Sequence, residues 1–302
     1  MSIVSLVKAK GYDVKSISAS IMESLDLINY SFEGKKIRNV VIKPNLCYYW
    51  DCSTGQTTDP KFVEALVNVL REKVGKAVDI TLVESDASAM KCKYAFKFLG
   101  YEKLSKTIGV KLVNLTEEKS ESTHISCNGK SYDFSVPAII KNADLTINLP
   151  KIKYTMKGIE LTCALKNIFG CNPYPLKYKL HADLGNVIVA LNKAMPFDLC
   201  IIDSIIASGS RPKKMGLIMA SQDPVAIDVA AANIAGVNPK KINYLKIAEQ
   251  EGVGGMRFVE KGVSLNQFRE VYPKKTFTKK FMGAAYPWVI RLGLGKRLGL
   301  TS

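Results

Sequence analysis

Hydrophobic positions along most of the chain follow one of two patterns, the spacing of an amphipathic helix or the short continuous run of a buried strand. Residues 14–30 carry apolar side chains at helical spacing, and the β-branched run at residues 37–44 has the character of a strand. Further strands are expected at residues 79–85, 109–115, 131–136, 143–150, 198–204 and 216–221. Further helices are expected at residues 57–75, 92–99, 158–170, 180–195, 223–236 and 240–250. Strands and helices therefore alternate, which predicts an α/β fold with a mostly parallel sheet flanked by helices.

The pattern runs on without a linker rich in proline, glycine or serine, and no internal repeat divides it beyond a doubled strand, Asp-Pro and helix phrase. We therefore expect a single α/β domain over residues 1–270, followed by a basic tail over residues 271–302. The tail contains seven lysines and arginines and no acidic residue, with Phe281 and Trp288 among its apolar side chains.

The net charge of the chain adds information about its binding partners. The sequence has 43 lysines and arginines and 27 acidic residues, which give a formal net charge of +16. Such a field attracts anions, whether phosphates, nucleic acid, acidic lipids or carboxylates. With two histidines in the chain, a zinc site built from several imidazoles is nearly excluded. The charge thus indicates the sign of a partner but leaves its identity open.

Cysteine usage and hydropathy indicate the compartment. The seven cysteines form neither a CxxC pair nor the cysteine run of a ferredoxin, which favours reduced and mostly inert thiols. The first residues contain too short an apolar run for a signal peptide, and no stretch of about 18 apolar residues is present to span a bilayer. We therefore expect a cytoplasmic protein.

Lysines flank the apolar stretch "LPKIKYTMKGIELTCALKNIFG" at residues 149–170. If the strand at 143–150 ends here, Lys151 and Lys153 project to the same side at its carboxyl end, where open α/β sheets bind ligands. Lys166, in the predicted helix that follows, would face the same crevice. Such lysines often cover apolar surface with their stems and keep the ammonium in water. Three of them near one another favour a shared anion site.

A second polar cluster follows the strand at residues 37–44. Lys43 and Asn45 lie at the end of this strand, and a polar loop leads from them to Thr58 and Asp59 at the start of the next helix. A strand end, a polar loop and a helix N-terminus together form a plausible anion cradle. The loop is not a Walker motif, because GxxxxGK[ST] is absent.

Several carboxylates are candidates for metal binding or proton transfer. Asp59 and Asp223 each precede a proline at a predicted helix start, which is typical of capping. Asp228, one turn further on, is harder to explain as a cap. Together with Glu84 and Asp203 at strand ends, it could bind a divalent metal or move a proton, whereas a solvated surface role is the alternative for each.

His181 stands beside Lys177 and Lys179 at the start of a predicted helix. A histidine in this position more often caps a helix or holds a hydrogen bond than acts as a base. Its basic neighbourhood nevertheless suits an anionic substrate, and we keep it as a candidate catalytic residue.

The phrases "VIKPN", "TTDP", "LPKIK", "ALKNIFG" and "ASQDPVAID", with His181 and Asp203 in this order, resemble the family called domain of unknown function 362 over residues 40–254. The resemblance implies that the recurrent polar positions of this family are Lys43, Asn45, Thr58, Asp59, Lys151, Lys153, Lys166, Asn167, His181, Asp203, Asp223 and Asp228. Members of the family are often associated with ferredoxin-like segments that bind iron–sulfur clusters. This chain lacks that cysteine run, so the resemblance implies a separate ferredoxin-like electron donor at most. A histidine usual in the family is replaced here by Tyr154-Thr155.

These observations favour an enzyme or binding protein for a phosphate- or carboxylate-bearing small molecule. Lys43, Lys151, Lys153 and Lys166 would bind the anion, and His181, Asp203, Asp223 and Asp228 would handle protons or a divalent metal. A redox reaction with an iron–sulfur partner is one concrete form. The sequence leaves the cofactor and the oligomeric state open.

Two hypotheses from other classes also fit the charge of the chain. The first is a protein that binds nucleic acid through its net charge of +16 and its basic, aromatic-containing tail. The second is a peripheral membrane protein, attached to an acidic lipid surface through the tail at residues 271–302.

Overall fold

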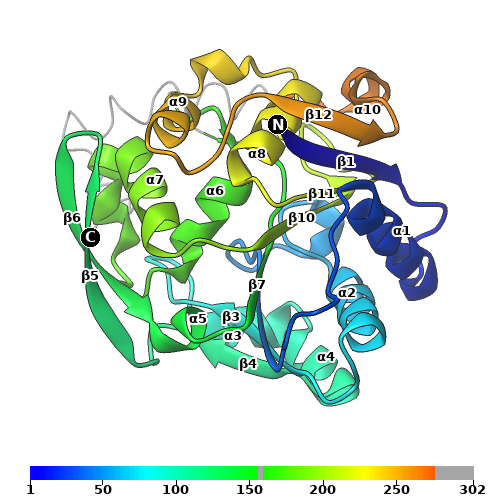
Figure 1. The fold of residues 1–302 in the computed structure, drawn as a ribbon, viewed down its shortest axis with the longest axis horizontal. Helices are drawn as coiled ribbons and strands as arrows, with labels where there is room; N and C mark the ends of the chain where they lie inside the picture. Colours follow the sequence, from blue (N-terminus) through cyan, green and yellow to red (C-terminus); the bar gives the residue numbers. More distant parts are fainter. Residues whose placement is uncertain (156–158, 276–302) are drawn as a thin grey trace.

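The computed structural model describes residues 1–155 and 159–275, and its centre is an eight-stranded sheet (Figure 1). In spatial order the strands are β12 (Phe258–Gly262), β1 (Ser2–Lys8), β11 (Lys213–Ser221), β10 (Leu199–Ala207), β7 (Leu145–Leu149), β2 (Asn39–Pro44), β3 (Asp79–Glu84) and β4 (Lys111–Asn114). All neighbouring pairs are parallel except those of β11, which runs antiparallel to both β1 and β10. The expected α/β fold with a mostly parallel sheet is thus confirmed.

Helices cover both faces of this sheet. The longer helical segments are α1 (Val14–Leu27), α2 (Pro60–Lys73), α3 (Cys92–Phe98), α4 (Tyr101–Ile108), α5 (Ala138–Lys141), α6 (Ala164–Asn167), α7 (Leu184–Ala194), α8 (Pro224–Ile234), α9 (Asn243–Gln250) and α10 (Leu265–Val271). Short 3₁₀ turns are η1 (Cys52–Thr54), η2 (Ile168–Cys171), η3 (Lys177–Asp183) and η4 (Pro239–Lys241). Helices α1 to α4 pack in one hydrophobic cluster and α6 to α10 in another.

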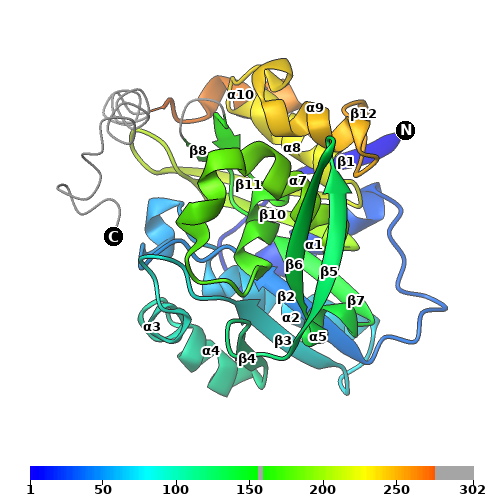
Figure 2. The same ribbon diagram turned by 90° about the vertical axis from the view of Figure 1, so that its left-hand side faces the viewer.

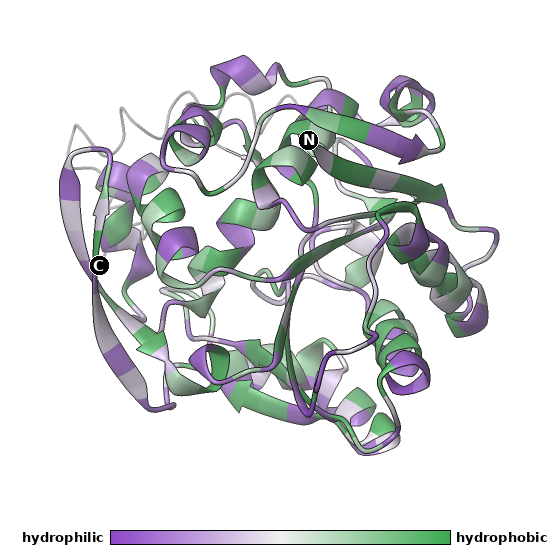
Figure 3. Cartoon of the chain, in the orientation of Figure 1, coloured by the Kyte–Doolittle hydropathy of each residue, from purple (hydrophilic) through white to green (hydrophobic). Residues whose placement is uncertain are grey.

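The sheet separates these two clusters because successive side chains of a strand point to opposite faces. In β2, Val40 and Ile42 belong to the cluster of α1 and α2, whereas Val41 belongs to the cluster of α7 and α8. Strands buried on both faces read as continuous apolar runs, and Figure 3 shows β1 and β10 hydrophobic along much of their length. The described part of the chain continues past residue 270, and Tyr272 is buried in the core.

A two-stranded hairpin lies outside the main sheet and packs against α7 (Figure 2). It is formed by β5 (Ser120–Cys127) and β6 (Lys130–Pro137), which pair in antiparallel fashion. The strand expected at 131–136 is therefore present but belongs to a separate sheet.

The helix expected over residues 158–170 is wrong in its first half. Here β8 (Lys153–Tyr154) and β9 (Leu161–Thr162) form a small antiparallel hairpin, and α6 begins only at Ala164. The reason is a long-range contact, because the carboxylate of Asp228 accepts hydrogen bonds from the first backbone N–H groups of α6. Apolar spacing alone could not reveal where this helix begins.

In the part of the chain that the structure describes, no helix has both the length and the apolar character needed to cross a bilayer. Most of the basic tail, residues 276–302, lies outside the described residues, so its expected role is not addressed by the fold.

Candidate functional site

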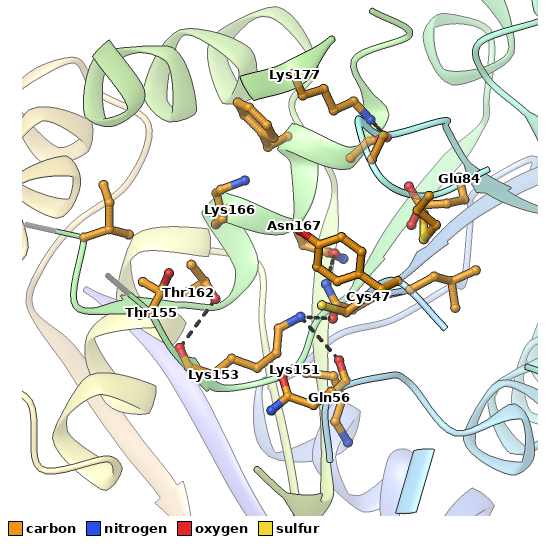
Figure 4. Close-up of a pocket in the computed structure, with 18 of the residues that line it drawn as sticks. Cys47, Gln56, Glu84, Lys151, Lys153, Thr155, Thr162, Lys166, Asn167 and Lys177 are labelled. Carbon is orange, nitrogen blue, oxygen red and sulfur yellow. Dashed lines mark hydrogen bonds between the residues drawn. The ribbon is translucent and has the colours of Figure 1, made fainter. Parts of the chain in front are cut away.

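A cavity of about 550 Å³ lies where the parallel strands β2, β3 and β7 end (Figure 4). Segments that follow each of these strands form its wall, together with the β8–β9 hairpin, α6, η2 and η3. The polar residues in its lining include Lys43, Asn45, Gln56, Glu84, Lys151, Lys153, Thr162, Lys166, Asn167, Lys177 and His181. The structure therefore brings together most of the lysines that the sequence singled out.

Lys43 is fully buried and paired. Its Nζ lies 2.8 Å from Oε2 of Glu84, on the adjacent strand, and donates to the carbonyl of Pro44 at 2.7 Å. Gly170 covers this pair, because a Cβ there would lie 2.8 Å from Cε of Lys43. Since the Glu84 carboxylate already neutralises the ammonium, Lys43 supports the cavity rather than offering it a free charge.

Lys151 is buried in a second ion pair. Its Nζ lies 3.1 Å from Oδ2 of Asp203 and donates to the carbonyl of Ile206 at 3.1 Å. Asp203 also accepts hydrogen bonds from the backbone N–H groups of Asp59, at 2.9 Å, and Ile205, at 3.1 Å. The pair thus connects the end of β7, the middle of β10 and the start of α2.

An amide network lies beside the Lys43–Glu84 pair, since Asn167 Nδ2 donates to the backbone carbonyl of Lys43 at 3.1 Å. Asn45 donates from Nδ2 to Asn167 Oδ1 at 2.8 Å, and Asn167 donates to Asn148 Oδ1 at 2.8 Å. Lys153 donates to Asn45 Oδ1 at 2.5 Å and to the carbonyl of Gln56 at 3.3 Å. Sequence reasoning missed Asn148, because nothing distinguishes a buried strand asparagine before its partners are known.

Thr58 and Asp59 shape the loop before α2 rather than the cavity wall. Thr58 Oγ1 accepts from the backbone N–H of Asn45 at 2.9 Å and donates to the carbonyl of Leu149 at 3.0 Å. Asp59 caps α2 by accepting from the N–H of Lys61 at 2.9 Å, and burial raises the pKa of its carboxyl. The expectation that Asp59 is a helix cap agrees with this geometry.

Lys166 projects from α6 into the cavity, with its Nζ 3.5 Å from the centre of the Phe169 ring. Among the described residues, its ammonium has neither a carboxylate partner nor a hydrogen-bond acceptor. Burial, followed by the positive charges of Lys177 and Lys153, lowers the pKa of Lys166 to about 7. Its charge is therefore poorly compensated within the protein.

Lys177, on η3, reaches the cavity from the side opposite Lys153 (Figure 4). Its Nζ donates to Oγ of Ser85 and lies 3.5 Å from the carbonyl of Gly170. Burial lowers the pKa of Lys177 to about 8, although the Glu84 carboxylate works against this shift. The sequence placed Lys177 beside His181 but gave no reason to include it among the binding residues.

His181 lines the same cavity, with its ring centre 5.9 Å from that of Phe169. Burial and the charge of Lys166 lower the pKa of His181 to about 4, so the imidazole is neutral at pH 7. Its Nδ1 is buried and has no hydrogen-bond partner within the described residues. The imidazole therefore has hydrogen-bonding capacity that the described protein leaves unused.

The structure places Asp223 and Asp228 away from the cavity lining. Asp223 caps α8 by accepting from the N–H groups of Val225 and Ala226, and it follows β11. Because β11 is antiparallel to β10, its end lies at the edge of the sheet opposite the cavity. Asp228 accepts from Ala164 N at 2.6 Å, and burial raises its pKa to about 7. It therefore acts on the site through the backbone that carries Lys166.

The described residues contain no group of three or more histidine, cysteine or acidic side chains arranged to hold a metal ion. Their seven cysteines are free thiols, and of these Cys47 and Cys163 line the cavity. The polar lining of the cavity is therefore dominated by amines and amides, with one imidazole, several hydroxyl groups and the carboxylate of Glu84.

Mutation can test whether the Lys43–Glu84 pair supports the structure of the cavity. Replacing Lys43→Met leaves the buried carboxylate of Glu84 without its cationic partner, although the backbone N–H of Ser85 still donates to it, and should lower the free energy of unfolding by about 3–5 kcal/mol. The double variant Lys43→Met with Glu84→Leu should recover most of that loss, because both charges are removed together. Urea denaturation measures both values.

The exposed pair Lys141–Glu121 is the matched control, because Lys141→Met should cost less than about 1 kcal/mol. A loss this small for Lys43→Met would show that Glu84 does not depend on this lysine.

Comparison with solved structures finds the lactate racemase apoprotein from Thermoanaerobacterium thermosaccharolyticum, at a TM-score of 0.43 and 11% identity. The match covers 83% of this chain and 57% of that chain, so this chain spans little more than half the length of that structure.

Comparison with curated sequences finds the thylakoid-associated protein sll1697 of Synechocystis sp.. The two sequences are 26% identical over 272 residues, which cover 83% of this chain and 79% of that protein. A family model described as "Domain of unknown function (DUF362)" matches residues 40–233. This match covers more than half of the chain and includes the strands, lysines and asparagines that build the cavity, and the protein therefore belongs to the DUF362 family.

Proposed function

We propose that the protein binds a small phosphate- or carboxylate-bearing molecule in the cavity, with Lys166 and Lys177 facing the anion and Lys153 beside it. The observation that carries this proposal is the set of contacts around Lys166. Its ammonium lies against an aromatic ring without an acceptor among the described residues, and of the four further lysines that line the same cavity two, Lys153 and Lys177, also lack a carboxylate partner there.

Desolvation of an ammonium is costly unless a counter-charge is close. In the described structure Glu84 pairs with Lys43 and Asp203 pairs with Lys151, whereas Lys153, Lys166 and Lys177 have no carboxylate partner. An anion between these three lysines would supply the missing charge and form charge-assisted hydrogen bonds. The position, at the carboxyl ends of parallel strands, is where open α/β sheets bind ligands.

The first prediction concerns the identity of the binding lysines. We expect at least one of three anions, inorganic phosphate, pyrophosphate or citrate, to raise the melting temperature of the protein. Each anion is compared with sodium chloride at equal ionic strength. Lys166→Met and Lys177→Met should each weaken binding of this anion by about 10- to 100-fold, which corresponds to the loss of one charge-assisted hydrogen bond. Isothermal titration calorimetry measures the affinities.

The control variant is Lys103→Met, which changes an exposed lysine of α4 and should leave the affinity unchanged. The proposal fails if none of these anions stabilises the parent protein, or if Lys166→Met binds the anion as the parent does.

The second prediction concerns pH. The pKa of Lys166 is lowered to about 7 and that of Lys177 to about 8, so both ammonium groups lose their protons between pH 6 and pH 9. Because a bound anion favours the charged forms, affinity should be highest near pH 6 and fall steadily towards pH 9. At pH 8, binding should take up protons, which calorimetry in buffers of different ionisation enthalpy detects. Constant affinity over this range would contradict a role for the two amines.

A second candidate function is attachment to an acidic membrane surface. Exposed aromatic side chains gather beside the cavity, where Phe98 contacts both Tyr49 and Tyr94, and Trp50 is 55% exposed. Lys93 lies over the Tyr94 ring in the same patch. Aromatic rings and lysines together suit the interface of an anionic bilayer. The relative from Synechocystis is also named as thylakoid-associated.

Vesicle sedimentation tests this second function. The protein should bind phosphatidylserine vesicles and not phosphatidylcholine vesicles, and the double variant Trp50→Ser with Phe98→Ser should lose most of the bound fraction. A truncated variant that ends at residue 275 distinguishes membrane binding through this patch from membrane binding through the basic tail. Binding that survives the double variant and disappears with the tail would assign attachment to residues 276–302 instead.

A further inference from the structure

The lysines around the cavity differ in what surrounds each amino group. Lys153 donates to Asn45 and to the Gln56 carbonyl, and Lys177 donates to Ser85. The N–H groups of both amines thus donate to acceptors of the protein. Lys166 has the Phe169 ring at 3.5 Å and no hydrogen-bond partner among the described residues, so no donor there engages the lone pair of its neutral form.

We propose that Lys166 is a nucleophile that forms an imine with an aldehyde or ketone group of the anionic ligand, which makes the ligand an anionic carbonyl compound. This inference rests on the proposed function: the charged lysines, Lys166 included, attract the anion, and in the fraction of molecules in which Lys166 is neutral, Lys153 and Lys177 hold the carboxylate or phosphate while Lys166 meets the carbonyl. The cavity of about 550 Å³ has room for a small metabolite of this class.

An amine attacks a carbonyl only when its proton is absent, and the surroundings of Lys166 favour that state. Burial and the neighbouring ammonium groups of Lys177, Lys153 and Lys43 lower its pKa to about 7. Roughly half of the molecules then carry a neutral Lys166 at pH 7, against about one in 3,000 for an ordinary lysine. The Phe169 ring, 3.5 Å from Nζ, favours the charged form and works against this shift. Lysines activated in this way by nearby cations are known to form Schiff bases.

The step balances without an oxidant or a reductant. The lone pair of Nζ forms a bond to the carbonyl carbon, and the π electrons of the carbonyl move to its oxygen. That oxygen then leaves as water with the two protons of the amine, which gives a C=N bond. His181, whose buried Nδ1 has no partner within the described residues, lies in the same cavity and is placed to relay one of these protons.

Reductive trapping tests the inference. The parent protein is incubated briefly at pH 7.5 with glyoxylate and sodium cyanoborohydride, and the modified lysines are then identified by peptide mass spectrometry. Lys166 should be modified about tenfold or more faster than other lysines, because far more of it is neutral. Lys166→Arg should lose this adduct, and Lys103→Met should retain it.

Further measurements distinguish a failure of the imine inference from a failure of the proposed anion binding. Lys177→Met should slow trapping of glyoxylate more than trapping of acetaldehyde, because loss of the Lys177 charge raises the pKa of Lys166 for both compounds but only glyoxylate has a carboxylate for Lys177 to bind. If phosphate stabilises the protein but glyoxylate modifies all lysines equally, the imine inference is wrong and anion binding stands. Lys166 could instead be trapped equally fast by glyoxylate and acetaldehyde while no anion shifts the melting temperature. In that case the assignment of Lys166 as a nucleophile stands and the proposal of anion binding is wrong.

Discussion

Pairing of buried charge is the constraint on which the rest of this structure depends. Lys43 and Lys151 both lie within the fold near the carboxyl ends of parallel strands, and each needs a carboxylate because an unpaired buried ammonium is strongly destabilising. Glu84 and Asp203 meet that need from neighbouring strands. The pairs fix the ends of β2, β3 and β7 and the middle of β10 relative to one another, and this fixed edge carries the more exposed lysines of the cavity.

The sequence predicts the ends of strands well but not their neighbours. Lys43, Lys151 and Glu84 were all expected at strand ends, because an apolar run followed by a polar residue is a local signal. Which carboxylate meets which lysine depends on the strand order β10, β7, β2, β3, and this order joins segments far apart in the chain. The four lysines expected to bind one anion therefore divide into two neutralised pairs and two cavity-facing cations.

The direction of a strand, like its neighbours, depends on contacts between segments far apart in the chain. Here it has a larger effect on the predicted site than the strand order has. Asp203 and Asp223 were both expected among the residues that handle protons or a divalent metal, and nothing local shows that β11 runs antiparallel to β10. One reversal moves Asp223 to the opposite edge of the sheet, where it accepts from Gly255 N and from Ser2 Oγ. The prediction of Asp-Pro capping needed no such information, because a cap is made by residues two or three apart.

Asp228 shows how a buried carboxylate far along the chain can set the chemistry of the cavity. It accepts from the N–H groups of Ala164 and Leu165, so α6 begins two residues before Lys166 and presents that side chain to the cavity. Asp228 uses its oxygens on the backbone, and Glu84 and Asp203 use theirs on other lysines. The described acidic groups nearest the site are thus committed to the scaffold, and the charge of Lys166 is left for a ligand to balance.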